Sequence, residues 1–358
     1  MPNTPLPTFG NFELAGIAVL VAALGLWIIY RFLDKLPRPK SKRLTVGHEL
    51  RLIKLNTLII FAALFSASWD IWWHRAVGRD SLWELPHIFM YSLATIGIAL
   101  GIYIWRHTRE KLWKKMVLAL MIVPLSAPFD NFWHIVFGVE DLSRPISLSW
   151  SPPHMALDIA VILVLACLLK ALYRHHKVKD QTFFGTLIFG ALYVQATFLV
   201  MPFHPTEGWG QVWGFWGAGL LASVYIFVLL MAQRWSKSGV AAIMTSIFGL
   251  LLMMTAYGKE TAPQILLMPH DRGPNWIYLF AYIGTAAFLD YTRFTHNLWA
   301  RGALAGGIWS LILFGSSSRF FAPEFQYGWP EIIIATVSGL IGGWLAVVLY
   351  DYIEKRRR

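Results

Sequence analysis

The chain has 358 residues, of which 56% are hydrophobic and only 14% are charged, and its formal net charge is +11. Because about a quarter of the residues in a soluble domain are charged, this composition excludes an ordinary soluble protein. It predicts an all-α, polytopic transmembrane helical bundle. The single cysteine, Cys167, excludes disulfides within the chain and clusters of thiolate metal ligands.

Long apolar runs predict about eleven membrane spans, most of them close to the ~20 residues that a bilayer core requires. In chain order the expected spans are residues 13–33, 57–74, 86–105, 116–136, 153–173, 184–202, 212–233, 240–257, 276–290, 303–316 and 332–350. The spans at 276–290 and 303–316 are short for a crossing. The first span has neither a basic leader nor a small-residue cleavage site, so we expect it to be retained as a helix.

Lysine and arginine residues gather in alternate loops between these spans. The basic segments are residues 31–54, 106–115, 174–179, 234–237, 293–301 and 356–358. All of them lie on one side of the membrane if the N-terminus is outside, and the positive-inside rule makes that side cytoplasmic. We therefore expect a multi-pass protein of the cell membrane (the inner or plasma membrane) with a cytoplasmic C-terminus. Topology and contact with anionic membrane lipids explain the net charge, so no nucleic-acid partner is expected.

Two stretches of the chain repeat one pattern of polar residues. Each has an aspartate, a histidine four residues later, and a second histidine directly after a proline at the start of the next span. These residues are Asp70, His74 and His87 in the first copy and Asp130, His134 and His154 in the second. The copies are offset by 60 residues up to the acidic residue of the loop, after which the second copy has seven additional residues.

The repeat predicts two sites with metal-binding capacity. Asp70 and His74 share one helix face because they are four residues apart, and Pro86 suits the first turn of the helix that begins near His87. Three ligands then converge and leave a coordination position open, which suits copper, non-haem Fe(II) or zinc. The alternative is a hydrogen-bonded network that ties the hairpin ends together. Both copies begin on an outward-going span, so they are expected to be parallel repeats.

Further polar residues lie at the same predicted membrane level. Asp158 could act as a ligand or orient His154 from outside the coordination sphere. Three other residues could add ligands to a shared outer site, namely His204, His270 and Asp271. We divide the chain into an N-terminal span with its basic loop (1–56), the repeated hairpins (57–175, with copies at 57–105 and 116–173) and six further spans (184–358).

The first copy resembles the C subunit of the particulate methane and ammonia monooxygenases, which are copper membrane monooxygenases. The resemblance rests on Asp70-x-x-Trp73-His74, Arg79-Asp80-Ser81 and Pro86-His87-Ile88, and it covers about residues 60–175. It implies copper ligation by Asp70, His74 and His87, and it aligns the second triplet with a family site whose first member is asparagine. Where the family's C subunit would end, this chain is expected to continue with six more spans. The chain has no counterpart of the soluble copper domain that the family carries on another subunit. A wider set of bacterial membrane proteins shares the D-x-x-W-H…P-P-H pattern.

Three functional hypotheses follow. The first is a copper- or iron-dependent oxidase or hydroxylase subunit that acts at the outer face on a small apolar or lipid-soluble substrate; zinc would instead favour Lewis-acid hydrolysis. The second is a non-catalytic copper-binding accessory or assembly protein of a membrane complex, which would have other subunits as partners. The third is an electron-transfer subunit that holds haem b between histidines such as His74 and His134.

Overall fold

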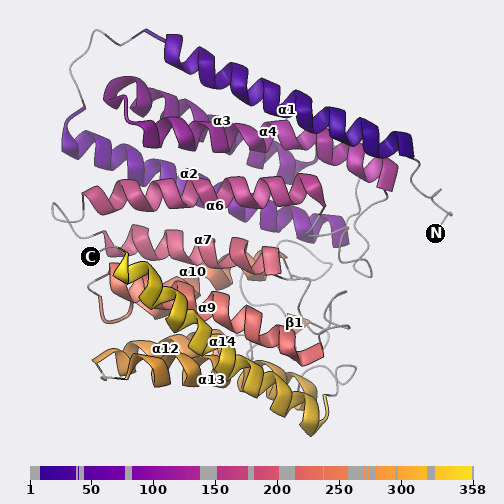
Figure 1. Ribbon diagram of the computed structural model, residues 1–358, viewed down its shortest axis with the longest axis vertical. Coiled ribbons are helices and arrows are strands. Elements are labelled where there is room, and N and C mark those ends of the chain that lie inside the picture. The colour runs from indigo at the N-terminus through magenta and orange to yellow at the C-terminus, as the bar shows by residue number, and fades with distance from the viewer. Residues whose placement is uncertain are drawn as a thin grey trace. The chain divides into compact units, whose positions relative to one another are not determined.

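The computed structural model describes residues 9–37, 39, 44–76, 83–137, 151–175, 181–200, 214–236, 238–256, 269–270, 273–274, 279–294, 297–320 and 327–356. Within these ranges the regular structure is helical apart from one pair of two-residue strands, which confirms the all-α class (Figure 1). The chain forms two compact units, one of Met1–Ala67 with Asp80–Asp180 and one of Ser68–Arg79 with Gln181–Arg358. The division falls within α2, which is nevertheless one continuous helix.

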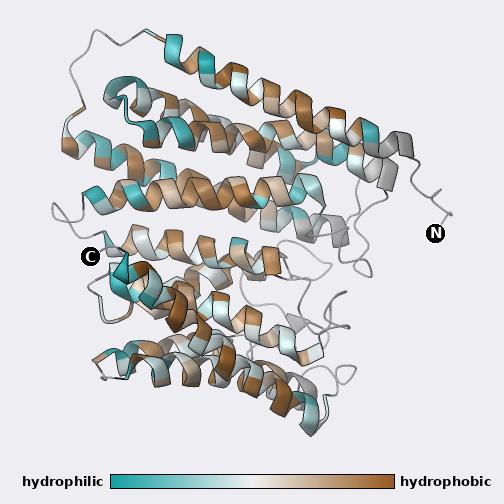
Figure 2. Ribbon diagram, in the orientation of Figure 1, coloured by the Kyte–Doolittle hydropathy of each residue, from teal (hydrophilic) through white to brown (hydrophobic). Residues whose placement is uncertain are grey.

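Nine of the described helices are long and apolar enough to cross a membrane. Figure 2 shows hydrophobic residues along most of α1 and α6, for example, as expected of helices in contact with lipid. The chain is therefore a multi-pass membrane protein. Two predicted spans, 240–257 and 276–290, coincide with helical segments too short to be counted among the nine. The total of eleven, the N-out orientation and the parallel repeats remain predictions.

The first unit contains four whole helices and α2 up to Ala67, and α1 attaches to the others by its C-terminal end. The helices are α1 (Phe9–Lys35), α2 (Val46–Ala76), α3 (Leu85–Thr108), α4 (Lys111–Phe137) and α6 (Pro152–Arg174). Lys114 Nζ on α4 lies 2.6 Å from Asp34 Oδ1 and 3.1 Å from the ring centroid of Tyr30. Arg109 Nη2 donates to the carbonyl oxygen of Leu36 at 2.7 Å. The exposed apolar face of α1, where Leu20 is 70% accessible, suits contact with lipid.

The core of the first unit lies between α2, α3, α4 and α6. Trp113 and Met116 on α4 are fully buried there. α3 approaches α4 closely because Gly101 has no side chain, and a Cβ there would lie 2.8 Å from Val117 Cγ2. α2 meets α3 where the Asn56 side-chain amide donates to the carbonyl oxygen of Gly97 at 3.5 Å. These contacts fix α3 against both α2 and α4.

The second unit is a helical bundle that also includes the C-terminal part of α2. Its regular elements are α7 (Thr182–Val200), η2 (Gly214–Trp216), α9 (Gly217–Trp235), α10 (Ala241–Ala256), β1 (Pro269–His270), β2 (Gly273–Pro274), the π-helical turn η3 (Phe280–Gly284), α12 (Thr285–Tyr291), η4 (Thr292–Phe294), α13 (Leu298–Phe320) and α14 (Trp329–Lys355). β1 and β2 are antiparallel, with Pro269 opposite Pro274 and His270 opposite Gly273.

An aromatic cluster fills the core of the second unit. The rings of Tyr193, Tyr225 and Tyr282 lie with centroids 4.9–5.7 Å apart, and Trp309 lies 5.6 Å from Tyr282. The Tyr225 hydroxyl donates to the carbonyl oxygen of Tyr282 at 2.5 Å and lies 2.8 Å from Ser246 Oγ. The buried phenol is therefore hydrogen-bonded, as a polar group in an apolar core requires.

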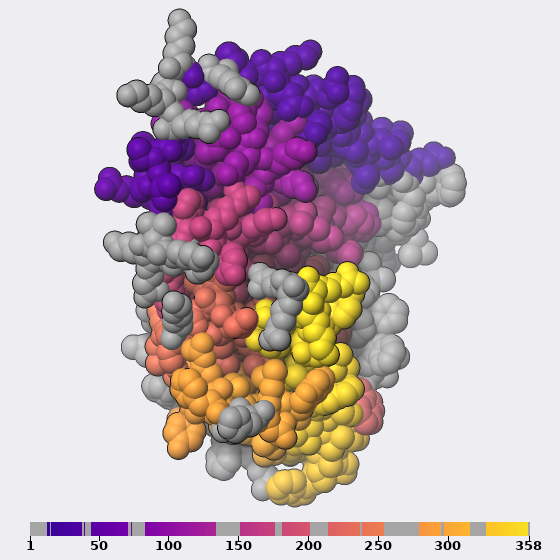
Figure 3. All heavy atoms as spheres, turned by 60° about the vertical axis from the view of Figure 1, so that its left-hand side comes forward, coloured from indigo at the N-terminus to yellow at the C-terminus, as the bar shows by residue number. Residues whose placement is uncertain are grey.

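α13 and α14 lie side by side through a seam of glycines (Figures 1 and 3). A Cβ added at Gly306 would meet the carbonyl oxygen of Gly339 and would lie 2.9 Å from the amide nitrogen of Gly343. α9 joins this contact through Ser338, whose Oγ accepts from the Gly219 N–H at 2.9 Å. Backbones can approach this closely only where side chains are absent, a common device in membrane helix packing.

A buried polar network joins α9, α10, α12 and α13. Asp290 Oδ1 accepts from Gln233 Nε2 at 2.8 Å and from the Ala242 N–H at 3.2 Å, and Asp290 Oδ2 accepts from the Ile243 N–H at 3.0 Å. Arg301 Nη2 donates to Gln233 Oε1 at 3.1 Å. The Asp290 carboxylate therefore caps the start of α10 from a different helix, a placement that the helix dipole favours.

Candidate metal centre

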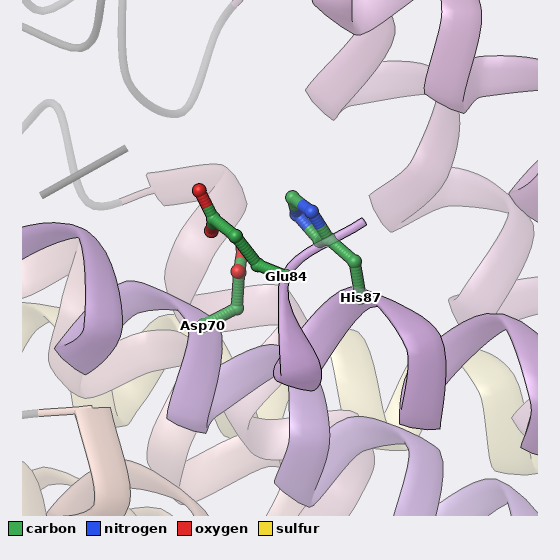
Figure 4. Close-up of side chains that lie close together, drawn as sticks. All are labelled: Asp70, Glu84 and His87. Carbon is green, nitrogen blue, oxygen red and sulfur yellow. The ribbon is translucent and has the colours of Figure 1, made fainter. Parts of the chain in front are cut away.

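The first copy of the repeat places three potential ligands on one helical hairpin. Asp70 lies near the C-terminal end of α2, whereas Glu84 and His87 lie at the start of α3 (Figure 4). Glu84 is the N-cap residue of α3, and Pro86 in the first turn leads directly into His87. Proline suits this position because an N–H in the first turn of a helix has no intrahelical partner, so the N–H that proline lacks would make no hydrogen bond within the helix. The hairpin thus brings a helix end next to a helix start.

The potential ligand atoms of Asp70, Glu84 and His87 all lie within 4.8 Å of one another. Two ligands on opposite sides of one ion are separated by ~4.2 Å when each metal–ligand bond is ~2.1 Å, so a small closing movement suffices. Glu84 and His87 are buried, with 6% and 4% of their surfaces exposed. Two carboxylates gathered around an imidazole in a buried setting favour a cation between them.

Aromatic rings flank this cluster. The His87 imidazole stacks on the Tyr91 ring, with centroids 5.7 Å apart and an interplanar angle of 25°. On the neighbouring helix, Trp69 and Trp73 meet edge to face at 5.9 Å, directly beside Asp70 in the sequence. The Tyr91 ring thus packs on the imidazole, and the two tryptophan rings lie on the same helix as Asp70.

The other predicted ligand of the first copy, His74, lies one turn beyond Asp70 on α2. Residues four apart on a helix share a face, so the backbone agrees with the predicted register. The His74 side chain lies outside the described residues. Its ligation remains a prediction, and it would supply a fourth protein ligand.

The second copy brings Asp130 and His154 together from α4 and α6. His154 Nε2 lies 3.3 Å from Asp130 Oδ1, and His154 Nδ1 lies 2.8 Å from Ser151 Oγ. Ser151 also caps α6, because its Oγ accepts from the His154 backbone N–H at 3.4 Å. Both ring nitrogens of His154 therefore face protein oxygens. This geometry suits either an orienting contact beside a metal or the alternative of a hydrogen-bonded network.

The remaining predicted residues are placed only in part. His134 lies one turn beyond Asp130 on α4, but its side chain is outside the described residues. Asp158 lies on α6, one turn after His154. His204 and Asp271 are outside the described residues. His270 belongs to the two-residue strand β1, and its side chain is not described.

Sequence reasoning missed two residues, Glu84 and Ser151. Both stand three positions before a histidine, in Glu84-Leu85-Pro86-His87 and in Ser151-Pro152-Pro153-His154. Serine before prolines is a recognisable N-cap signal, and glutamate three residues before histidine is a ligand pattern of carboxylate metal sites. Glu84 and Ser151 lie outside the Asp-x-x-x-His spacing that defines the repeat, so that spacing does not indicate them.

Ser151→Ala is expected to lower the melting temperature of the purified protein by about 2–4 °C. The hydroxyl both caps α6 and contacts the His154 ring, and loss of an N-cap costs ~1 kcal/mol. Thermal unfolding followed by circular dichroism in detergent measures the change. Ser126→Ala on α4 is the control, because its hydroxyl donates to the carbonyl oxygen of Val123 within the same helix and caps no helix start. Equal melting temperatures for the two variants would contradict the capping role.

No protein-family model, curated protein or solved structure matches this chain. The functional argument therefore depends on the chemistry of the site. Two carboxylates and an imidazole can hold a divalent transition-metal ion, with His74 as a predicted further ligand. A donor set of this kind can leave coordination positions open for small molecules.

Proposed function

We propose that the chain is an integral membrane metalloprotein whose first site holds a copper or non-haem iron ion for the oxidation or hydroxylation of a small apolar or lipid-soluble substrate. The observation that carries the proposal is the convergence of Asp70, Glu84 and His87 within 4.8 Å at a helical hairpin. Ionisable groups at membrane depth are costly to bury and commonly serve function. The resemblance of the first copy to copper membrane monooxygenases supports the redox assignment.

The residues present fit such an ion. Asp70 and Glu84 would neutralise its charge, while His87 would bind through a neutral imidazole nitrogen whose ring is oriented by Tyr91. When bound, copper or iron supplies the redox chemistry with dioxygen that side chains lack. Trp69 and Trp73 would present apolar surface to a lipid-soluble substrate beside Asp70. The proposed location is the outer face of the inner or plasma membrane, and the proposed partners are other membrane subunits.

Metal analysis of the full-length protein tests this proposal. The protein is purified in detergent, incubated with copper, iron, zinc and manganese salts in separate samples, desalted, and measured by elemental mass spectrometry. We expect about one ion per chain for the wild type and less than about a tenth of that for the double variant Asp70→Ala/His87→Ala, because two ligands are lost. An absorption spectrum of the same samples would reveal haem by its Soret band.

His107→Ala is the matched control for the metal analysis. His107 lies on the same helix, α3, but its ring contacts the carbonyl oxygen of Tyr103 at 2.8 Å and lies far along the chain from the cluster. This variant should retain the ion. Wild-type protein that takes up no transition metal, or a double variant that retains it, would contradict the proposal. Metal binding without oxygen consumption in the presence of apolar substrates would instead favour the accessory-protein function.

A further inference from the structure

The two copies of the repeat place equivalent residues at the start of α3 and α6. Glu84 and Ser151 are the N-cap residues of these helices, and His87 and His154 follow at the third helical position. Each copy also has an aromatic pair that meets edge to face around its aspartate, Trp69 with Trp73 and Phe129 with Trp133. At the N-cap position, however, the first copy has a carboxylate and the second a hydroxyl.

These two N-cap residues have different roles. Ser151 acts locally, because its hydroxyl accepts from the His154 N–H and contacts the His154 ring. Glu84 makes no side-chain hydrogen bond to the first turn of α3. Its buried carboxylate instead lies in a group with the Asp70 carboxylate and the His87 imidazole. Helix capping therefore explains the serine but not the glutamate.

We propose that Glu84 is a metal ligand that sets the selectivity of the first site for Fe(II) or Mn(II) over Cu(I). The second copy lacks this selectivity because Ser151, which has no carboxylate, occupies the equivalent position. This inference rests on the proposed metal-binding function. Asp70 and Glu84 give the first cluster two anionic oxygen ligands, whereas the second copy has one, Asp130. Carboxylates favour harder divalent ions, and Cu(I) favours softer ligands.

The local sequence supports the same metal class. Glu84-x-x-His87 places a carboxylate and an imidazole at the start of one helix, and Asp70 adds a carboxylate from the preceding helix. A Glu-x-x-His pair together with carboxylates from other helices is the ligand set of iron and manganese carboxylate proteins built from helical bundles. The described cluster contains one such pair, so we assign it to a single ion.

Binding of Mn(II) and Cu(I) to the full-length protein in detergent tests the role of Glu84. Free Mn(II) is measured by electron paramagnetic resonance during an anaerobic titration, and Cu(I) is measured by competition with a chromophoric chelator. We expect Glu84→Gln and Glu84→Ser to weaken Mn(II) binding by ~100-fold or more, since even residues behind the ligands change affinity by 10–100-fold. Their affinity for Cu(I) should stay within about threefold of the wild type.

His107→Ala on α3 is the matched control, because the His107 ring contacts the carbonyl oxygen of Tyr103 and its loss should leave Mn(II) binding unchanged. Glu84→Gln keeps the shape of the side chain, and its circular dichroism spectrum and elution volume are compared with those of the wild type. Wild-type Mn(II) affinity in Glu84→Gln would overturn the selectivity role, as would a wild type that binds Cu(I) but not Mn(II). A wild type that binds none of the ions tested would instead overturn the proposed function itself.

Discussion

Gly306→Ala is expected to lower the stability of the second unit by about 3 kcal/mol, which corresponds to a fall of roughly 6–12 °C in melting temperature. The new methyl group would meet the carbonyl oxygen of Gly339 and the backbone of Gly343 on α14. Backbone atoms cannot rotate away as a side-chain tip can, so α13 and α14 would have to separate along the seam. Thermal unfolding in detergent, with elution volume as a check on aggregation, measures this loss.

Gly315→Ala on the same helix is the control for this prediction. A Cβ at Gly315 would make ordinary contacts, at 3.5 Å to Ile332 Cγ2 and 3.6 Å to Leu311 Cδ1. Because alanine also has a higher helix propensity than glycine, this variant should be as stable as the wild type or slightly more stable. If Gly306→Ala unfolded at the same temperature as Gly315→Ala, the close approach of the two helices would be refuted.

Hydropathy predicted the positions of the helices well because the length of an apolar run is a local property. Predicted spans such as 116–136 and 153–173 lie within α4 and α6. It was less informative for 276–290, where the described part is divided between a π-helical turn and a short helix. Windowed hydropathy carries no signal for a π-turn. The glycine seam has a visible four-residue spacing, Gly302 to Gly306 and Gly339 to Gly343, but pairing these two helices required the structure.

Part of the candidate metal site could be predicted from spacing alone. Asp70 and His87 were predicted as ligands, and the structure brings their side chains into one cluster. Helical periodicity links Asp70 to His74, but it cannot reveal the contribution of Glu84, which lies across the hairpin loop. The association of Glu84 with Asp70 depends on how α2 and α3 meet, a tertiary property that no local pattern contains.

The two copies show how a single N-cap position can divide the roles of a repeat. In the first copy the carboxylate of the N-cap residue, Glu84, adds charge to the cluster and makes no capping hydrogen bond to the start of α3. In the second copy Ser151 stabilises the helix start and faces one nitrogen of His154. We infer that the first copy is suited to hold an ion tightly. The predicted second site at Asp130, His134 and His154 includes one residue, His134, whose side chain lies outside the described residues.

Asp290→Asn is expected to destabilise the second unit by about 3–5 kcal/mol, the usual cost of leaving a buried polar network without its charged member. The carboxylate accepts from Gln233 through Oδ1 and from the N-terminal N–H groups of α10 through both oxygens. An asparagine has a single acceptor oxygen, so its amide group would face at least one of these donors. Gln233 would also lose part of the support that aligns it with Arg301.

The loss is measured by chemical unfolding in detergent with Asp351→Asn as the control. Asp351 on α14 pairs with Lys355 at 2.7 Å, but both side chains are exposed, so its replacement should cost no more than about 0.5 kcal/mol. The comparison separates burial from charge, because the same atoms are changed in both variants. If Asp290→Asn were as stable as Asp351→Asn, the network would not be what holds α10 to α9 and α12. The aromatic cluster around Tyr225 would then have to supply that stability.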